Sequence, residues 1–100
     1  MTAISLAQRA RWDLARLTDF LAEQDPAAAD ATAALILDAL LILEQHPRIG
    51  RPAPDRLREL VIQRGRTGYV ALYRVSRDEL SVEVLAIRHQ RESGYHEDDL

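Results

Sequence analysis

The residues best suited to chemistry follow the apolar segment 82–87, near the end of the sequence. Arg88, His89 and Arg91 come directly after this segment, and Tyr95 lies four residues further on. Guanidinium groups bind anions, imidazole can exchange protons near neutral pH, and a phenol can stack on a base or donate a hydrogen bond. Because the apolar segment is typical of a buried strand, we expect these polar side chains to lie at one end of a β-sheet.

Several other kinds of chemistry have no support in the sequence. The chain contains no cysteine, all 13 of its basic residues are arginine, and its four serines lack a G-x-S-x-G motif. Thiol catalysis, lysine catalysis and the usual serine nucleophile are therefore excluded. The three histidines do not have H-E-x-x-H spacing, and no glycine-rich loop could hold a phosphate. The sequence predicts no metal site and no cofactor.

Charge divides the chain into three parts, and the net charge of −3 hides the contrast between them. Residues 48–91 carry ten arginines against five carboxylates, residues 1–47 carry three arginines against seven carboxylates, and residues 92–100 carry four carboxylates and no arginine. The basic centre is therefore the part that could attract an anion. The alternative is that these arginines only keep strand edges soluble.

Size and composition predict one domain, spanning residues 1–100. A chain with no cysteine, and with no basic leader followed by an apolar segment, fits a bacterial cytoplasm. No apolar run approaches the roughly 18 to 20 residues that span a bilayer, so we expect no membrane partner.

Two helices are expected in the first half of the chain. Ser5 and Gln8 form a capping box, which predicts a helix from there to about residue 23. Asp25 followed by Pro26 predicts a second helix that ends near His46. Large aliphatic residues surround this second helix almost completely, so one interpretation is a partner protein that covers part of it. The alternative is a helix packed between the first helix and a sheet, with some leucines left at the surface.

The second half predicts three long strands over residues 57–64, 69–75 and 80–89, which are rich in β-branched and aromatic residues. Turns are expected at 65–68 and 76–79, so the strands form an antiparallel meander. A stiff connector with three prolines, residues 46–54, links them to the helices. The predicted fold class is α+β: a two-helix hairpin packed on an antiparallel sheet of three long strands, with a possible short strand at residues 2–4.

The meander brings together the end of the first long strand, the start of the second and the end of the third. The residues gathered there form the candidate target-binding site: Arg64, Arg66, Tyr69, Arg88, His89 and Arg91. Arg58, Arg74 and Arg77 are expected at the opposite end of the sheet. Trp12 lies off the apolar stripe of the first helix. It is a candidate contact for a partner, and the alternative is that it packs under a neighbouring loop.

Four short phrases along the chain resemble one family. Residues 57–62 read LRELVI, residues 68–74 read GYVALYR, residues 88–92 read RHQRE, and the connector 47–52 reads PRIGRP. In this order they resemble the RelE/ParE toxin superfamily over nearly the whole chain. The resemblance implies a small bacterial toxin of a type II toxin–antitoxin system, held inactive by a cognate antitoxin whose tail wraps around it.

The resemblance implies two possible activities, because ParE-like members inhibit DNA gyrase and RelE-like members cleave messenger RNA on the ribosome. Where the nuclease pattern has basic side chains, this chain has Val61, Gln63 and Val70. The favoured prediction is therefore a gyrase inhibitor with no catalytic residues. The alternative is a ribosome-dependent endoribonuclease, whose catalytic residues would be Arg64, Arg88, His89 and Tyr95.

Partners follow from the same resemblance. The antitoxin is expected to cover Trp12, Leu37 and Leu41 and to pair acidic side chains with Arg64, Arg66 or Arg88. A further alternative is an interaction module of the same fold that has lost its toxicity.

Overall fold

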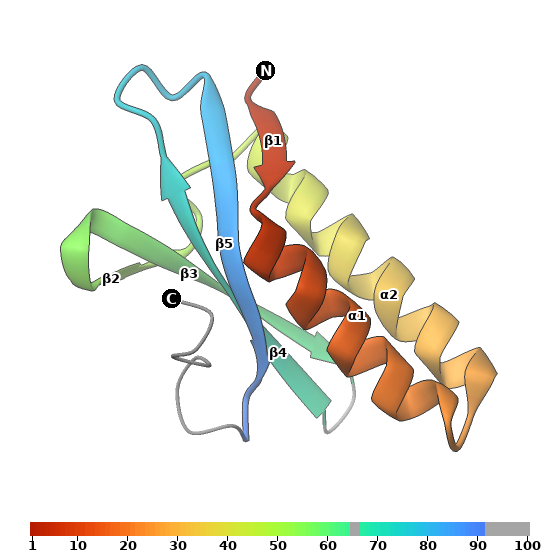
Figure 1. Cartoon of the computed structure of the whole chain (residues 1–100). Helices are drawn as coiled ribbons and strands as arrows, with labels where there is room; N and C mark the ends of the chain where they lie inside the picture. Colours follow the sequence, from red (N-terminus) through yellow and green to blue (C-terminus); the bar gives the residue numbers. More distant parts are fainter. Residues whose placement is uncertain (65–66, 92–100) are drawn as a thin grey trace.

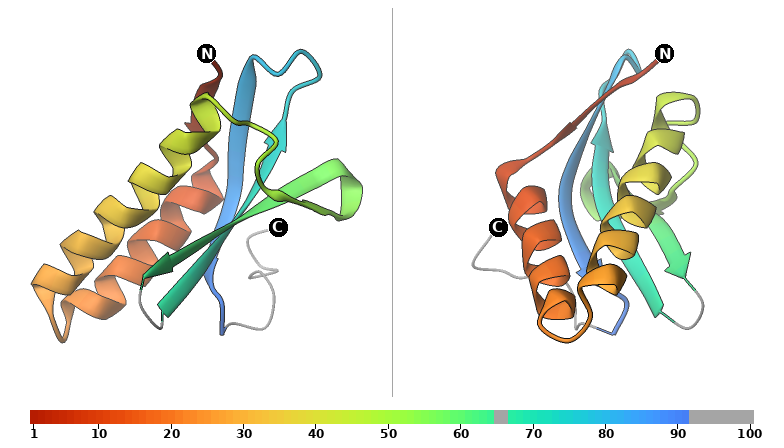
Figure 2. Two further views of the ribbon diagram at one scale, coloured as in Figure 1. Left: turned by 180° about the vertical axis from the view of Figure 1, so that it is seen from behind. Right: turned by 90° about the vertical axis from the view of Figure 1, so that its right-hand side faces the viewer.

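A computed structural model describes residues 1–64 and 67–91, which form a helical layer and a five-stranded sheet (Figure 1). The helices are α1 (Gln8–Ala22) and α2 (Pro26–Leu41), and they run antiparallel as a hairpin. Both helices pack on the same face of the sheet, as the side view in Figure 2 shows. The predicted α+β class and the predicted helix hairpin are confirmed.

The strands lie in the order β1-β5-β4-β3-β2. The three long strands are β3 (Leu57–Arg64), β4 (Thr67–Val75) and β5 (Ser81–His89), and they form the predicted antiparallel meander. Two short strands, β1 (Ala3–Leu6) and β2 (Arg51–Ala53), lie at the edges of the sheet. The leading strand that the sequence suggested is therefore present, slightly later than expected.

β1 pairs with β5 in parallel, so the sheet is mixed rather than purely antiparallel. Ser5 lies opposite Glu83 in this pairing, and the N–H of Ala7 donates a hydrogen bond to the carbonyl of Val84 at 2.8 Å. These hydrogen bonds hold the segment before α1 extended. The predicted capping box of Ser5 and Gln8 is therefore wrong: α1 begins at Gln8, after Ala7, with no side-chain cap.

α2 begins as the sequence predicts. The side chain of Asp25 accepts a hydrogen bond from the N–H of Ala28 at 3.2 Å, and Pro26 occupies the first turn. One side of the helix faces the core and α1. The buried residues on that side are Ala29, Thr32, Ile36 and Leu40.

The end of α2 differs from the prediction. The helix stops at Leu41 and continues as a 3₁₀ turn over Ile42–Glu44, before the predicted end near His46. Pro47 disfavours helical backbone in the residue before it, and the chain tightens over the last turn.

The segment Pro26–Glu44 is 19 residues long and is apolar enough to cross a membrane, judged by length and composition alone. This finding corrects the expectation that no apolar segment approaches the length that spans a bilayer. Asp30 and Asp38 divide the segment into shorter apolar runs in the sequence, but the helix continues through both residues. The core helix of a globular protein meets the same two criteria. Ile36 and Leu40 of this segment belong to the core between the helices and the sheet.

The proline-rich connector contains a strand that was not predicted. β2 pairs antiparallel with the start of β3, and Pro52 lies opposite Arg58. Pro52 is tolerated because an edge strand can lack one hydrogen-bond donor. In the 3₁₀ turn Pro54–Arg56, which joins β2 to β3, Asp55 and Arg56 have φ angles of 63° and 64°.

Tyr73 links the connector, residues 46–54, to the core. Its hydroxyl oxygen accepts a hydrogen bond from the N–H of Gly50 at 2.9 Å, and its side chain is fully buried. Burial raises the pKa of this hydroxyl, although the Gly50 hydrogen bond and the charge of Arg58 oppose the shift. The guanidinium of Arg58 donates to the carbonyl of Gly50 at 2.7 Å. The connector is therefore held at both the N–H and the carbonyl of Gly50.

The pairing of β4 with β5 contains a β-bulge. Leu72 lies opposite Ala86, but Tyr73 lies opposite Val84, so Leu85 is an extra residue in β5. Side chains alternate between the two faces of a strand, and one extra residue exchanges the faces of all later positions. The bulge therefore decides on which face each residue at the end of β5 lies.

Candidate functional site

The predicted target-binding residues that the structure describes, Arg64, Tyr69, Arg88, His89 and Arg91, lie where β3 ends, β4 begins and β5 ends. This region is termed the His89 end of the sheet. Two neighbouring rows of cross-strand partners define it, Ile62–Tyr69–His89 and Val61–Val70–Arg88.

These two rows lie on opposite faces of the sheet. Ile62 and Tyr69 belong to the core that packs against the helices, and the ring of His89 meets the ring of Tyr69 edge-on at 5.3 Å. Adjacent residues of a strand point to opposite faces, so Arg88 lies with Val61 and Val70 on the face away from the helices. The site that the sequence treats as one cluster is divided by the backbone of the sheet.

His89 is held in one orientation on the helix side. The Nδ1 atom accepts a hydrogen bond from the N–H of Arg91 at 3.0 Å, and the ring packs against Tyr69. A neutral imidazole with Nδ1 as acceptor carries its proton on Nε2. His89 is thus part of the structure of the strand end.

Arg88 bends back toward the chain that follows it. Its guanidinium lies 3.3 Å from the carbonyl oxygen of His89 and 3.4 Å from that of Gln90, and donates to both. The side chain is half-buried. Its neighbours in the same row, Val61 and Val70, carry no charge, so Arg88 is the only cation of that row.

The other predicted site residues are placed less closely. Arg64 ends β3, and Arg91 is exposed just after β5. Arg66 and Tyr95 lie outside the described residues. The roles predicted for these four residues stay predictions.

Large apolar side chains are exposed on both helices. Leu37 and Leu41 are 44 % and 55 % exposed on α2, and Trp12 is 58 % exposed on α1. Residues four apart on a helix share a face, so Leu37, Leu41 and the adjacent Ile42 form one apolar strip. The expectation that α2 leaves large aliphatic residues uncovered is confirmed. Their contact with an antitoxin stays a prediction.

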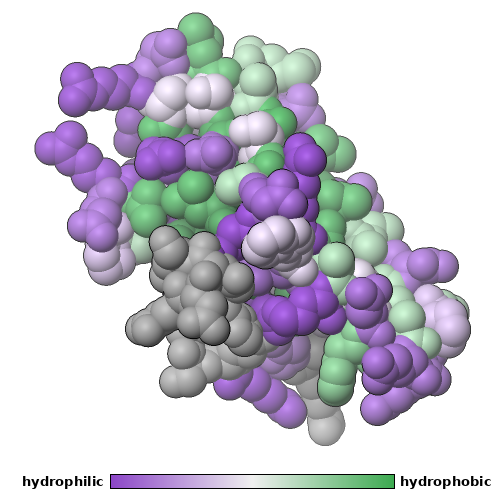
Figure 3. Space-filling model, viewed as in Figure 1, coloured by the Kyte–Doolittle hydropathy of each residue, from purple (hydrophilic) through white to green (hydrophobic). Residues whose placement is uncertain are grey.

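The side of the molecule seen in Figure 3 mixes hydrophobic and hydrophilic side chains, so apolar area is broken into small patches there.

Arg74 and Glu83 form a cross-strand ion pair at 2.7 Å, on the same face as Arg88. Among residues 1–64 and 67–91, no group of three or more histidine, cysteine or acidic side chains could hold a metal ion.

Sequence reasoning missed one buried carboxylate that positions the end of β5. The Oδ2 atom of Asp13 in α1 accepts a hydrogen bond from the backbone N–H of Ile87 at 2.9 Å. Asp13 is 3 % exposed, and its Oδ1 atom lies 3.6 Å from the guanidinium of Arg16. Because β1 pairs with β5 only as far as Val84, Asp13 supplies an acceptor that no strand provides beyond that point.

Comparison with known proteins identifies the class of protein that this fold and site define. Residues 4–94 match the family described as ParE toxin of type II toxin-antitoxin system, parDE. The chain therefore belongs to the ParE toxin family, within the RelE/ParE toxin superfamily. Toxins of this family are typically intracellular. The cytoplasmic location expected from the sequence stays a prediction.

Two relatives of known name come from Caulobacter vibrioides. Toxin RelE3 is 40 % identical over 92 residues, which cover 92 % of this chain and 98 % of the relative. Toxin RelE1 is 36 % identical over 86 residues, which cover 86 % of this chain and 90 % of the relative. The family is thus described as ParE, whereas these relatives carry the name RelE.

Two solved structures share the fold. The chromosomal ParDE system of P. aeruginosa matches with a TM-score of 0.73 and 22 % identity, over 89 % of this chain and 96 % of that one. The toxin–antitoxin complex RelBE2 of Mycobacterium tuberculosis matches with a TM-score of 0.57 and 26 % identity, over 91 % and 93 %. The predicted membership of the RelE/ParE superfamily is confirmed.

Proposed function

We propose that this toxin inhibits DNA gyrase by binding it, without cleaving a substrate. The observation that carries the proposal is the separation of Arg88 and His89 onto opposite faces of the sheet. In the endoribonuclease alternative these two residues would have to act on one phosphate. Their separation supports the gyrase inhibitor, which needs a binding surface but no catalytic group.

The chemistry of RNA cleavage explains why this separation matters. A base must take the proton of the 2′-hydroxyl, and cations must stabilise the charge that develops at the same phosphate. Here the Nδ1 atom of His89 already accepts a hydrogen bond, and the guanidinium of Arg88 is engaged with backbone carbonyls. Beside Arg88, Val70 is buried and Val61 is 39 % exposed, so the apolar side chain accessible there suits contact with a protein surface better than charge stabilisation.

A second candidate function is the ribosome-dependent endoribonuclease, because the two relatives from C. vibrioides are named RelE toxins. Its catalytic residues would be Arg64, Arg88, His89 and Tyr95. For this function Arg88 and His89 would have to be brought to one face of the sheet on the ribosome.

Purified toxin is expected to stop DNA supercoiling by gyrase at concentrations that leave cell-free translation unaffected. Arg88→Glu should weaken this inhibition at least about tenfold, because it reverses the one charge of its row in a predicted binding surface. Arg74→Gln, at the other end of the same face, is the matched control and should inhibit like the parent.

Two outcomes would contradict gyrase inhibition, and one would contradict only the assigned binding surface. Site-specific cleavage of ribosome-bound messenger RNA, lost in His89→Ala and Tyr95→Phe, would establish the endoribonuclease instead. Equal inhibition by the parent and Arg88→Glu would remove the His89 end from the binding surface. Folded protein that affects neither gyrase nor translation, and does not arrest growth when overproduced, would favour the interaction module without toxicity.

We further propose that a cognate antitoxin covers Trp12, Leu37 and Leu41 and places acidic side chains against Arg88. The support is that both solved structures come from toxin–antitoxin systems, together with the apolar strip exposed on α2. Burial of large apolar side chains and pairing of a partly desolvated arginine are the usual sources of affinity in such an interface.

Leu41→Asp is expected to weaken binding of the antitoxin encoded beside this toxin at least about tenfold, because it puts a charge into an apolar contact. Leu80→Asp is the matched control, since Leu80 is equally large and 62 % exposed but lies in the β4–β5 turn. Calorimetric titration measures both affinities. Parent-like binding by Leu41→Asp would exclude the apolar strip of α2 from the interface.

A further inference from the structure

A groove rich in arginine lies at the end of the sheet opposite His89. It has a volume of about 360 Å³ and lies between the β2–β3 turn and the β4–β5 turn. Four arginines line it, Arg48, Arg56, Arg58 and Arg77, and its apolar walls include Pro52 and Val75. None of the described residues that line it is acidic. We propose that this groove binds an acidic peptide segment of a partner protein, in which carboxylates alternate with small apolar side chains.

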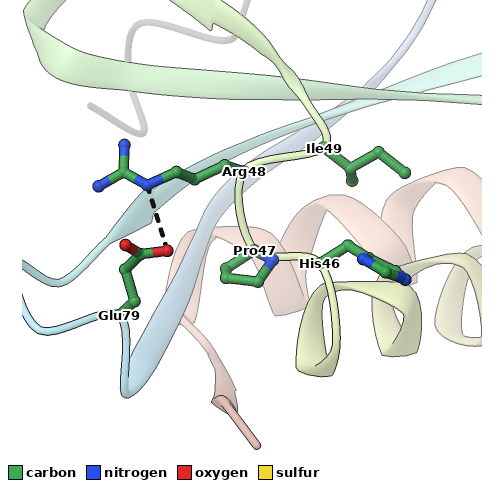
Figure 4. A pocket seen from close by; sticks show the side chains of 5 residues that line it. All are labelled: His46, Pro47, Arg48, Ile49 and Glu79. Atoms are coloured by element: carbon green, nitrogen blue, oxygen red, sulfur yellow. Dashed lines mark ion pairs between the residues drawn. The ribbon is translucent and has the colours of Figure 1, made fainter.

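Two of the four arginines are held in place by the protein itself. The guanidinium of Arg58 donates to the carbonyls of Arg48 at 3.0 Å and Gly50 at 2.7 Å. Arg48 forms an ion pair with Glu79 at 3.2 Å, and Figure 4 shows the two side chains pointing toward each other from the connector and the β4–β5 turn. These contacts fix the wall of the groove between the two turns.

The other two arginines are available to a ligand. Arg56 and Arg77 are exposed, and neither forms an ion pair with any carboxylate in the described part of the chain. Arg56 lies in the β2–β3 turn and Arg77 lies in the β4–β5 turn, at two sides of the groove. Two free guanidinium groups on separate turns match two carboxylates spaced along an extended peptide.

Backbone strain is the second observation that points to this end of the sheet. Within residues 1–64 and 67–91, the residues other than glycine with positive φ are Asp55, Arg56 and Glu79, and all three lie in the two turns that flank the groove. Two consecutive left-handed residues in a hairpin turn normally take asparagine and glycine. Arginine at position 56 therefore occupies a left-handed backbone conformation that is unfavourable for it. Such strained residues are common at binding sites.

The lining favours a peptide over a nucleic acid. Among the described residues that line the groove none is aromatic, so they offer no surface on which a base could stack. The apolar walls can accept small side chains between the carboxylates, which a phosphate backbone does not offer. The net charge of −3 also opposes general attraction to nucleic acid. The groove is separate from the His89 end, so the inference is independent of the gyrase proposal.

Fluorescence anisotropy tests the groove with the full chain and a labelled peptide of alternating glutamate and alanine. The peptide should bind, and its counterpart with glutamine in place of glutamate should not. Arg56→Gly and Arg77→Gln should each weaken binding about tenfold, the effect of losing one charge-assisted hydrogen bond. Asp55→Gly is the matched control, because it also places glycine at a left-handed position but leaves all four arginines, and it should bind at least as well as the parent.

Thermal unfolding separates binding from folding. Glycine adopts the left-handed conformation without steric strain, and this gain offsets the greater entropy of glycine in the unfolded chain. Arg56→Gly and Asp55→Gly should therefore both be at least as stable as the parent. A stable Arg56→Gly protein with reduced affinity supports the proposal. Absence of peptide binding, or parent-like affinity in both arginine variants, overturns it. Tighter binding of single-stranded RNA or duplex DNA than of the peptide, lost in the same variants, overturns it in favour of nucleic acid.

Discussion

Gly50→Ala is expected to lower the free energy of unfolding by about 3 kcal/mol, the upper part of the range for overpacked sites. An alanine Cβ at this position would lie 2.6 Å from the hydroxyl oxygen of Tyr73 and 2.7 Å from the carbonyl oxygen of Glu59. The second contact is with backbone in β3, which cannot move without disturbing its pairing with β2. The loss corresponds to a decrease in Tm of about 15 °C in a domain of this size, which thermal denaturation would detect.

Tyr73→Phe provides the test of the geometry behind this prediction. Alone, it should cost about 1 to 3 kcal/mol, because the buried N–H of Gly50 loses its acceptor. Combined with Gly50→Ala, it should not restore stability, since the Cβ would still lie 2.7 Å from the Cε1 position of the ring at residue 73 and from the carbonyl oxygen of Glu59. A double variant as stable as the parent would show that the connector does not pack against the sheet as described.

Asp13→Ala is expected to destabilise the fold by about 2 to 3 kcal/mol, because the buried N–H of Ile87 would lose a charged acceptor. Urea denaturation measures the effect. Asp13→Asn retains a side-chain carbonyl and should lose less. The control is Asp19→Ala, an exposed aspartate on the same helix, whose change should stay within about 0.5 kcal/mol. Equal stability of Asp13→Ala and Asp19→Ala would contradict the role assigned to Asp13.

Local patterns in the sequence were enough to predict most of the regular structure. Asp25 and Pro26 mark the start of α2 because the cap is formed by residues close in sequence. β3 has the predicted ends at Leu57 and Arg64, and the meander follows from short turns between β-rich segments. In these cases the determining interactions are local or join neighbouring strands.

Long-range pairing decided the elements that the sequence did not predict. Ser5 and Gln8 have the spacing of a capping box, but Ser5 is held in β1 by β5, which lies far along the chain. Pro52 argues against a strand, yet the free edge of β3 accepts β2. Asp13 has the residue type of a solvent-facing helix position, and only the neighbouring strand edge explains its burial.

The candidate site was predicted in position but not in arrangement. The meander correctly places the ends of β3 and β5 beside the start of β4. Adjacent residues of a strand lie on opposite faces, so the alternation along β5 separates Arg88 from His89. The sequence does not reveal the extra residue Leu85, and this bulge determines that His89, rather than Arg88, lies on the helix side. Which predicted residues share a face therefore depends on strand register, which short patterns do not encode.

The parallel pairing of β1 with β5 has a consequence for the nascent chain. Ala3 lies opposite Ser81, and the hydroxyl of Thr2 donates to the carbonyl of Glu79 at 2.7 Å, so the first strand has no partner until the last strand has been made. The helical hairpin can form early, because its contacts are local. We therefore expect the sheet of a growing chain to remain incomplete until residues 81–89 have been synthesised.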